Sequence, residues 1–227
     1  MKISVITLFP EMFLSPFNES IIKRAIEKKL IDLEFINIRE FGIGKHKLVD
    51  DTPYGGGMGM VLRVDILHKA IEKVKVKNLN SKEEKIILLT AHGKTFNQVK
   101  AKNFSKLKHL ILICGHYEGF DERIKKYIDE EVSIGDFVLT GGEIPAMLIV
   151  DSVARLVKGV LSKGSLETES FSPLLEYPQY TKPQEYEGLK VPEILLSGNH
   201  PKINQWRNEK SIKITKQLRP DLLNKKS

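Results

Sequence analysis

The sequence contains a single cysteine, Cys114, among 227 residues. One thiol excludes an internal disulfide and a cysteine-based zinc cluster, and it fits a reducing, cytoplasmic location. No apolar run approaches the ~18 residues that a membrane span needs, so we expect no membrane partner. The apolar start at residues 1–9 is interrupted by Pro10 and Glu11, and no small-residue cleavage site follows. This favours a buried first strand over a signal peptide.

Two common nucleotide-binding motifs and any internal repeat are also missing. Residues 93–95 (GKT) resemble the end of a phosphate-binding P-loop, but Leu88 stands where that motif needs its first glycine. The glycines of residues 55–59 have the wrong spacing for a dinucleotide fingerprint and follow no predicted strand. We interpret residues 41–60 as a long glycine-rich loop whose backbone N–H groups are available to oxygen atoms of a ligand.

The net charge of +7 is concentrated at the C-terminal end of the chain. Residues 200–227 carry eight basic and two acidic residues, a net charge of +6, which leaves +1 for the rest. A near-neutral body with a basic end predicts a polyanionic partner, and nucleic acid is favoured over a merely solvated helix face. The basic residues are Lys202, Arg207, Lys210, Lys213, Lys216, Arg219, Lys225 and Lys226.

Alternating strand and helix patterns predict an α/β fold with helices layered on a parallel sheet. Strands are expected at residues 2–8, 32–38, 85–89 and 109–114. Helices are expected at residues 18–29, 65–75, 95–101 and 121–128, the first with Asn18 or Ser20 as its N-cap.

The chain is expected to divide into three parts. Residues 1–160 form the α/β domain, and the polar stretch 161–172 is a flexible linker. Residues 173–227 form a small, mostly helical domain, whose basic helix at about 201–218 carries the only tryptophan, Trp206.

The most informative segment is residues 133–146 (SIGDFVLTGGEIPA). Gly141 and Gly142 lack a Cβ atom, so their backbone can approach a ligand closely or turn sharply. Pro145 suits the first turn of a helix. We predict a loop, a short strand, a glycine turn and a helix start, which together cradle a ligand.

Further candidates lie near the expected strand ends. Cys114 is interpreted as an inert buried thiol, because no base partner is evident. Glu118 follows a strand, where an α/β sheet binds its ligands, and is a candidate for binding a cation or hydroxyl.

Arg155 with a carboxylate of the linker, Glu167 or Glu169, suggests a general base beside a charge-stabilising group. Spacing alone favours a solvated acidic loop instead.

Seven segments, taken in order, make the chain resemble the bacterial tRNA (guanine-N1)-methyltransferase family, of the knotted SPOUT class. The resemblance covers essentially the whole chain. The segments are 8–13 (LFPEMF), 50–60 (DDTPYGGGMGM), 114–119 (CGHYEG), 133–136 (SIGD), 141–146 (GGEIPA), 180–183 (YTKP) and 196–200 (LSGNH).

The resemblance implies a deep trefoil knot between about residues 85 and 150, and a homodimer with active sites shared between two chains. It implies S-adenosylmethionine as methyl donor, with Mg²⁺ as an aid whose ligands are not identified. The cofactor-binding residues would be Leu89, Thr90, Gly115, Tyr117, Glu118, Ser133, Ile134, Gly135, Leu139, Gly141, Gly142 and Pro145. The tRNA-binding residues would be Asp51, Tyr54, Gly57, Gly59, Ser197, Asn199, His200, Lys202 and Arg207.

The family methylates N1 of the guanine 3′ of the anticodon (tRNA position 37). A carboxylate removes the N1 proton, and an arginine stabilises the charge that develops at O6. The resemblance assigns these roles to Glu169 and Arg155. The chain departs from the family where Glu169 replaces an aspartate, and where residues 90–93 (TAHG) lack the usual proline and glutamine.

Two other classes of protein compete with this hypothesis. One is a non-catalytic RNA-binding module on the same scaffold, which the carboxylate–arginine pair and the glycine turn disfavour. The other is a nucleotide-binding α/β protein, which the broken P-loop and dinucleotide patterns disfavour. The sequence therefore favours a tRNA methyltransferase.

Overall fold

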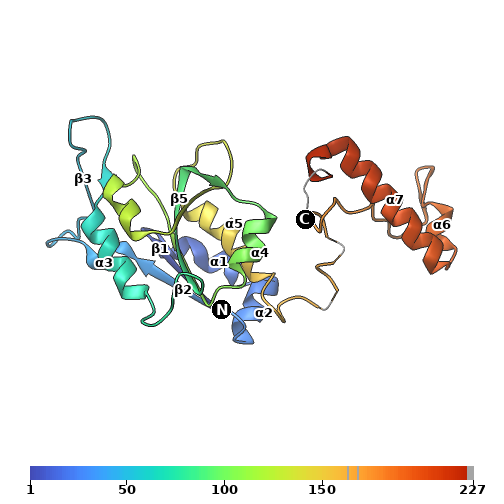
Figure 1. The fold of residues 1–227 in the computed structure, drawn as a ribbon, viewed down its shortest axis with the longest axis horizontal. Helices are drawn as coiled ribbons and strands as arrows, with labels where there is room; N and C mark the ends of the chain where they lie inside the picture. The colour runs from blue at the N-terminus through green and yellow to red at the C-terminus, as the bar shows by residue number, and fades with distance from the viewer. Residues whose placement is uncertain (163, 168, 224–227) are drawn as a thin grey trace. The chain divides into compact units, whose positions relative to one another are not determined.

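The computed structural model describes residues 1–162, 164–167 and 169–223 (Figure 1). The chain forms two compact units, Met1–Leu161 and Ser162–Ser227. Almost all of the expected linker, residues 161–172, therefore groups with the second unit. Across the residues that the structure describes, no helix has both the length and the apolar character needed to cross a membrane.

The first unit is built on a five-stranded sheet in which every pairing is parallel. The strand order is β2-β1-β6-β5-β7. The strands are β1 (Lys2–Thr7), β2 (Asp32–Asn37), β5 (Glu84–Thr95), β6 (His109–Ile113) and β7 (Glu130–Ser133). This arrangement confirms the predicted α/β class.

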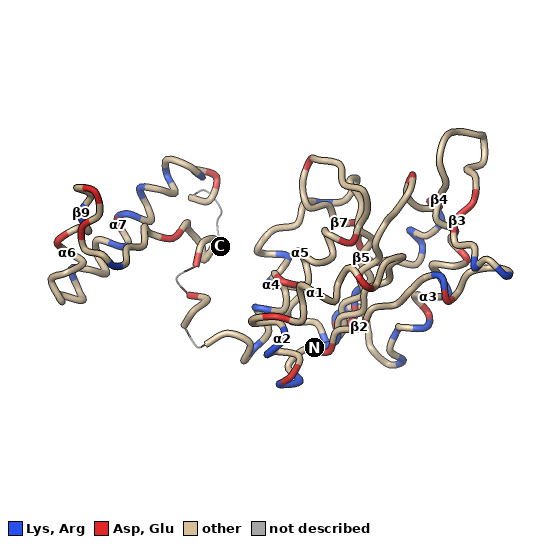
Figure 2. The backbone as a smooth tube through the Cα atoms, turned by 180° about the vertical axis from the view of Figure 1, so that it is seen from behind, with Lys and Arg blue, Asp and Glu red and all other residues tan. Residues whose placement is uncertain are grey.

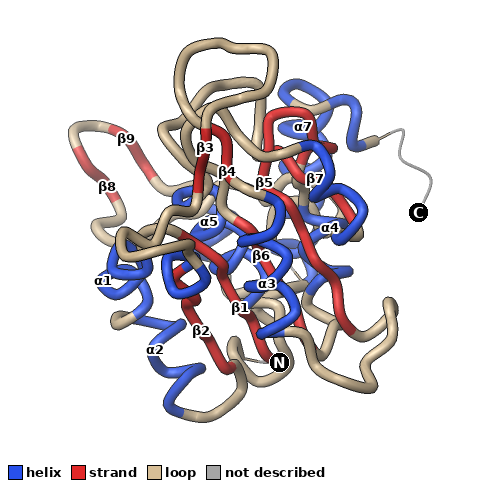
Figure 3. The backbone as a smooth tube through the Cα atoms, turned by 90° about the vertical axis from the view of Figure 1, so that its left-hand side faces the viewer, coloured by secondary structure: helices blue, strands red, loops and turns tan. Residues whose placement is uncertain are grey.

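Helices cover both faces of this sheet (Figure 3). Successive side chains of a strand point to opposite faces, so Leu110 and Leu112 belong to one buried cluster and Ile111 and Ile113 to the other. The first cluster includes residues of η1 (Pro10–Phe13), α1 (Leu14–Phe17), α2 (Ser20–Glu27), α4 (Gln98–Phe104) and α5 (Glu143–Ala154). The second includes residues of η2 (Ile38–Phe41), α3 (Val64–Val74) and η3 (Glu122–Tyr127). A short pair, β3 (Asp50–Asp51) with β4 (Val61–Leu62), closes the glycine-rich loop.

The second unit centres on α7 (His200–Leu218), close to the helix predicted at 201–218. The side chain of Asn199 caps α7 by accepting a hydrogen bond from the Lys202 N–H at 3.2 Å. Its other elements are β8 (Glu185–Tyr186), β9 (Leu189–Lys190), α6 (Glu193–Leu196) and η4 (Pro220–Leu222). Lys225 and Lys226 lie outside the described residues.

Several local predictions were wrong. The N-cap of α2 is Glu19, which makes no side-chain cap bond, so neither Asn18 nor Ser20 caps this helix. The predicted helix at 95–101 starts later, because β5 continues to Thr95 and the side chain of Asn97 caps α4. The segment 121–128 forms a 3₁₀ helix rather than an α-helix.

The short strand expected in the segment 133–146 does not form, because β7 ends at Ser133 and residues 136–140 are irregular. These residues find no strand partner, and the side chain of Val138 is 94% exposed. Gly135, at φ 146°, turns the chain away from β7 just before them. The glycine turn therefore follows an irregular loop, while α5 begins at Glu143 as the sequence indicated.

A row of buried polar groups crosses the amino-terminal edge of the sheet. His109 is 1% exposed, and its Nδ1 lies 2.7 Å from Glu84 Oε2. Its Nε2 lies 2.8 Å from the Ser4 hydroxyl, which in turn donates to Glu34 Oε2 at 3.1 Å. Burial lowers the pKa of His109, although the Glu84 carboxylate opposes the shift.

This lowered pKa predicts a pH-dependent stability. Between the folded pKa and the unfolded value of about 6.5, the unfolded chain binds more protons, so stability is lost as the pH falls below about 6.5. We expect the melting temperature of the wild type to fall more steeply from about pH 7.5 to about pH 5.5 than that of His109→Gln. Parallel pH profiles for the two proteins would contradict this role of His109.

Candidate functional site

A cleft of about 410 Å³ opens at the carboxyl ends of β5, β6 and β7. Three chain segments form its walls, at residues 88–92, 115–125 and 131–145. Ligands of open α/β sheets bind at this edge, because the strands end there and the loops that follow converge. The described residues that line the cleft belong to the first unit.

The twelve residues expected to bind a cofactor all line this cleft. They are Leu89, Thr90, Gly115, Tyr117, Glu118, Ser133, Ile134, Gly135, Leu139, Gly141, Gly142 and Pro145. Their role as ligands stays a prediction, but segments up to 56 residues apart in the sequence meet around one space.

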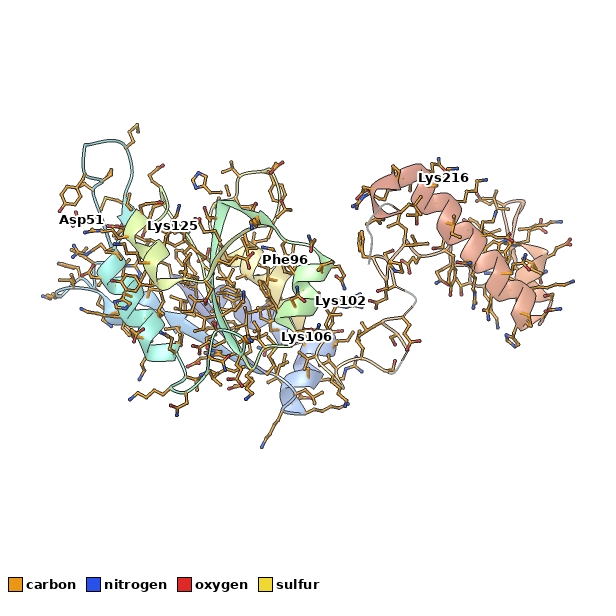
Figure 4. The ribbon with its side chains drawn as sticks, in the orientation of Figure 1. Asp51, Phe96, Lys102, Lys106, Lys125 and Lys216 are labelled. Carbon is orange, nitrogen blue, oxygen red and sulfur yellow. The ribbon has the colours of Figure 1, made fainter. Side chains whose placement is uncertain are left out.

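Sequence reasoning missed several other residues of the cleft wall. His116 lies inside a motif that was noted, but no role was given to it. Phe120 and Lys125 come from the turn and the 3₁₀ helix after β6 (Figure 4 labels Lys125). No local pattern marks Lys125, because it reaches the wall only through the packing of η3, where it pairs with Glu122 at 2.6 Å and Glu131 at 3.3 Å.

The glycine turn packs directly on the end of β6. The Gly142 N–H donates to the Gly115 carbonyl at 2.8 Å. A Cβ on Gly142 would lie 2.6 Å from Gly115 N and 2.7 Å from Cys114 Cα, which no real side chain tolerates. A Cβ on Gly141 would collide with the Glu143 carboxylate and lie 2.9 Å from His116 Cδ2. Glycine is therefore required at position 142, where the neighbours are backbone atoms, whereas at position 141 the neighbours are side-chain atoms.

Cys114 supports the interpretation of an inert thiol. Its side chain is 2% exposed. Burial, and then the nearby Glu143 carboxylate, raise the pKa of the Cys114 thiol well above its ordinary value. The thiol stays protonated at neutral pH, and a protonated thiol is a poor nucleophile.

The glycine-rich loop is attached to the rim of the cleft. The Glu118 N–H donates to the Met60 carbonyl at 3.0 Å, and the Leu62 N–H donates to the Gly119 carbonyl at 2.9 Å. A Cβ on Gly59 would lie 2.5 Å from Glu118 Oε1, so this loop glycine touches a residue of the cleft wall.

The other loop residues expected to bind tRNA are placed differently. Asp51 pairs with Arg63 at 3.1 Å (Figure 4 labels Asp51). Tyr54 is fully exposed at the loop tip, and Gly57 has a φ of 135°. The exposed ring of Tyr54 makes it available to a partner, whereas Asp51 also has a structural role.

The remaining tRNA-binding candidates lie around the start of α7 in the second unit, and Figure 2 shows Lys and Arg along this helix. They are Ser197, Asn199, His200, Lys202 and Arg207. The Ser197 hydroxyl and Asn199 side chain are used in local hydrogen bonds. The Arg207 guanidinium stacks 4.9 Å from the centre of the Tyr177 ring, so part of its role is internal packing.

The two catalytic candidates belong to different units. Arg155 is the C-cap of α5 in the first unit. Glu169 lies at the start of the second unit, where its carbonyl accepts a hydrogen bond from the Ser172 N–H at 3.1 Å.

No group of three His, Cys, Asp or Glu side chains within the described residues is arranged to hold a metal ion. No ligand is therefore assigned to the expected magnesium.

Comparison with known proteins identifies a family over almost the whole chain. Residues 1–225 match the family described as tRNA (Guanine-1)-methyltransferase TrmD. A tRNA (guanine-N(1)-)-methyltransferase of Clostridium botulinum (strain Hall) is 57% identical over 227 residues, covering 99% of this chain and 92% of the relative. The protein of that name from Dictyoglomus turgidum is 53% identical over 229 residues, covering 100% of this chain and 91% of the relative. The similarity spans both units.

The packing of the glycine turn predicts that adding a single methyl group at Gly142 destabilises the fold. Gly142→Ala forces a Cβ against the backbone of Cys114 and Gly115, which directly follow β6. We expect a loss of about 1–3 kcal/mol in the free energy of unfolding, measured by denaturant titration. The matched control is Val138→Ala in the same segment, where the exposed side chain should change stability by less than about 0.5 kcal/mol. Equal stability of both variants would show that the turn can move away from β6 at no cost.

Proposed function

The chain belongs to the tRNA (guanine-N1)-methyltransferase family, and we propose that it transfers the methyl group of S-adenosylmethionine to N1 of the guanine immediately 3′ of the anticodon. The observation that carries this proposal is the cleft, around which all twelve residues expected to bind the cofactor lie together. A tRNA substrate implies that the reaction takes place in the cytoplasm.

The cleft suits a ligand that is part apolar and part polar. Its volume of about 410 Å³ lies within the ~300–1,000 Å³ typical of small-molecule sites. Leu89 and Leu139 offer apolar walls for an adenine ring, and Gly115 leaves backbone groups accessible. Glu118 and Tyr117 add polar groups at the rim for the ribose and methionine parts. When bound, the cofactor supplies an electron-poor methyl group.

The chain's own residues supply the acid–base chemistry. Guanine N1 carries a proton and becomes a good nucleophile only when that proton leaves. We assign the proton to the Glu169 carboxylate, while negative charge shifts towards O6 of the base. Arg155 donates hydrogen bonds to that developing charge. Glutamate serves in place of the family's aspartate because its ordinary pKa, about 4.3 against 3.9, differs little.

An exposed apolar face favours a homodimer. Ile144 and Leu148, four residues apart on one side of α5, are 51% and 43% exposed. The neighbouring η1 exposes Met12, at 46%, and it contacts α5. A second copy seated on this face would bury it, and we propose that the two chains then share their active sites.

We also propose the trefoil knot of this family between about residues 85 and 150. The convergence of residues 88–92, 115–120 and 134–142 on one cleft supports it. Each segment lies at or after the end of a different strand, β5, β6 or β7.

The test of the function is methyl transfer from labelled S-adenosylmethionine to tRNA transcripts. We expect product with guanine 3′ of the anticodon and none with adenine there, since adenine N1 carries no proton to remove. Digestion of the product should yield N1-methylguanosine. Cofactor and tRNA binding without turnover would support the alternative of a non-catalytic RNA-binding module.

Within the same assay, Glu169→Gln tests the base. We expect the rate of methyl transfer to fall by ~10²–10⁴, because the amide cannot accept the proton, with the cofactor dissociation constant unchanged. Glu167→Gln, two residues away in the same segment, is the matched control and should remain active. The reverse result, with Glu167→Gln inactive and Glu169→Gln active, would reassign the base.

The basic face of α7 predicts that the protein binds the tRNA backbone whatever the nucleotide sequence of the tRNA. Lys202, Lys213 and Lys216 are exposed and, at spacings of 11 and 14 residues, lie along one stripe of the helix (Figure 4 labels Lys216). Replacing all three by glutamine should weaken binding of every tRNA alike and reduce the slope of log affinity against log salt by about 0.7–0.9 for each lost phosphate contact.

The control for this experiment removes the same charge elsewhere. Glutamine at Lys69, Lys73 and Lys77, exposed residues on and after α3 in the first unit, should leave the salt slope unchanged. If both triple variants behave like the wild type, the charge of α7 serves solubility only. Cofactor affinity should not change in either variant.

A further inference from the structure

One buried carboxylate beside the cleft has no part in the proposed chemistry. Glu143, the first residue of α5, is 3% exposed. An ionised carboxylate is costly to bury unless hydrogen bonds or charges compensate it. The N-terminus of α5 provides part of this compensation, because unpaired N–H groups give it a partial positive charge.

The remaining compensation comes from the other end of the chain. The hydroxyl of Thr7, the last residue of β1 and fully buried, donates to Glu143 Oε1 at 2.8 Å. The same hydroxyl accepts a hydrogen bond from the Phe9 N–H at 3.0 Å. A hydroxyl has one hydrogen to donate, so these two bonds together fix its orientation and commit that hydrogen to Glu143.

The second oxygen of Glu143 faces the glycine turn. A Cβ on Gly141 would collide with Glu143 Oε2 and would lie 3.2 Å from His116 Nε2, so the carboxylate and the imidazole flank this glycine. The His116 ring also packs on Phe9, with ring centres 5.1 Å apart. Contacts therefore run from the end of β1 to two residues of the cleft wall, Gly141 and His116.

We propose that Glu143 is a positioning residue. Held by Thr7, its carboxylate fixes the Gly141-Gly142 turn and thereby sets the affinity of the cleft for the methyl donor. Residues 7–9 line no part of the cleft, yet they become part of the cofactor site through this bond. The proposal rests on the proposed function, because it takes the cleft ligand to be S-adenosylmethionine.

The experiment uses the full-length protein with Thr7→Val, Thr7→Ser and Glu143→Gln. Valine keeps the volume of Thr7 and removes its hydroxyl, whereas serine keeps the hydroxyl. We expect Thr7→Val and Glu143→Gln to raise the dissociation constant of S-adenosylmethionine about tenfold, measured by calorimetry, and Thr7→Ser to remain near the wild type. The turnover number at saturating substrates should change less than about twofold, because the base and arginine are untouched. Glu27→Gln, an exposed carboxylate on α2, is the charge-matched control.

A second readout does not depend on the ligand. Amide hydrogen exchange at residues 141–143 should speed up about tenfold in Thr7→Val and not in Thr7→Ser, with the dimer content of both unchanged. The Thr7→Val/Glu143→Gln double variant should be no weaker in cofactor binding than Thr7→Val alone, because loss of the Thr7 hydroxyl already removes the bond that the neutral glutamine would only weaken.

Unchanged exchange and affinity in Thr7→Val would overturn the proposal, as would a loss of turnover number with unchanged affinity. If Thr7→Val does not fold, Glu143→Asp, which draws the carboxylate back by one methylene, takes its place with the same expected result. Failure of the wild type to bind S-adenosylmethionine would refute the proposed function instead, and the exchange measurement would still decide the role of Glu143.

Discussion

The close approach of the Gly142 backbone to the end of β6 is the constraint on which the site depends. The hydrogen bond from Gly142 N–H to the Gly115 carbonyl joins the loop after β7 to the loop after β6. Because a Cβ at Gly142 would meet the backbone of Cys114 and Gly115, the bond forms only with glycine there. This contact brings residues 133–142 over the strand ends and closes the cleft on one side. Without it, the cleft would lack one of its three walls.

The parallel sheet explains why the cleft forms where it does. All five strands run in the same direction, so every loop that follows a strand emerges at one edge. Buried apolar residues fill both faces, which leaves that edge as the place where polar chain can meet a ligand. At the opposite edge of the sheet, polar side chains are buried and pair with one another instead of facing a ligand. His109 contacts both Glu84 and Ser4 there.

The sequence predicted the parts of the fold that follow from local pattern. Strands β1 and β2 alternate, β6 is a continuous apolar run, and α3 has apolar residues at helical spacing. These elements and the basic helix α7 appear within one or two residues of their expected bounds. The extension of β5 to Thr95 was not predictable, because polar residues at its end are held in place only by pairing with Val132 and Ser133 of β7. The short strand expected in the segment 133–146 failed for the converse reason, since the apolar residues 137–139 find no strand partner.

For the candidate site, too, the sequence predicted individual residues but not the contacts between residues far apart in the chain. A family resemblance identified the residues of the cleft wall, but not what supports them. The partner of Glu143 is Thr7, 136 residues away, and no spacing in the sequence connects them. Lys125 and Phe120 likewise reach the wall only through tertiary packing.

The distribution of residues between the two units also bears on the order of events in the proposed reaction. The described residues that line the cleft, the proposed cofactor site, all belong to the first unit. The proposed base Glu169 and the basic helix α7 both belong to the second unit. A tRNA held by α7 therefore engages the same unit that carries the base. In the proposed reaction, cofactor binding depends on the packing of the glycine turn, whereas proton removal depends on bringing Glu169 to the guanine. Under this proposal the methyl donor binds without RNA, and proton removal begins only when the tRNA is bound.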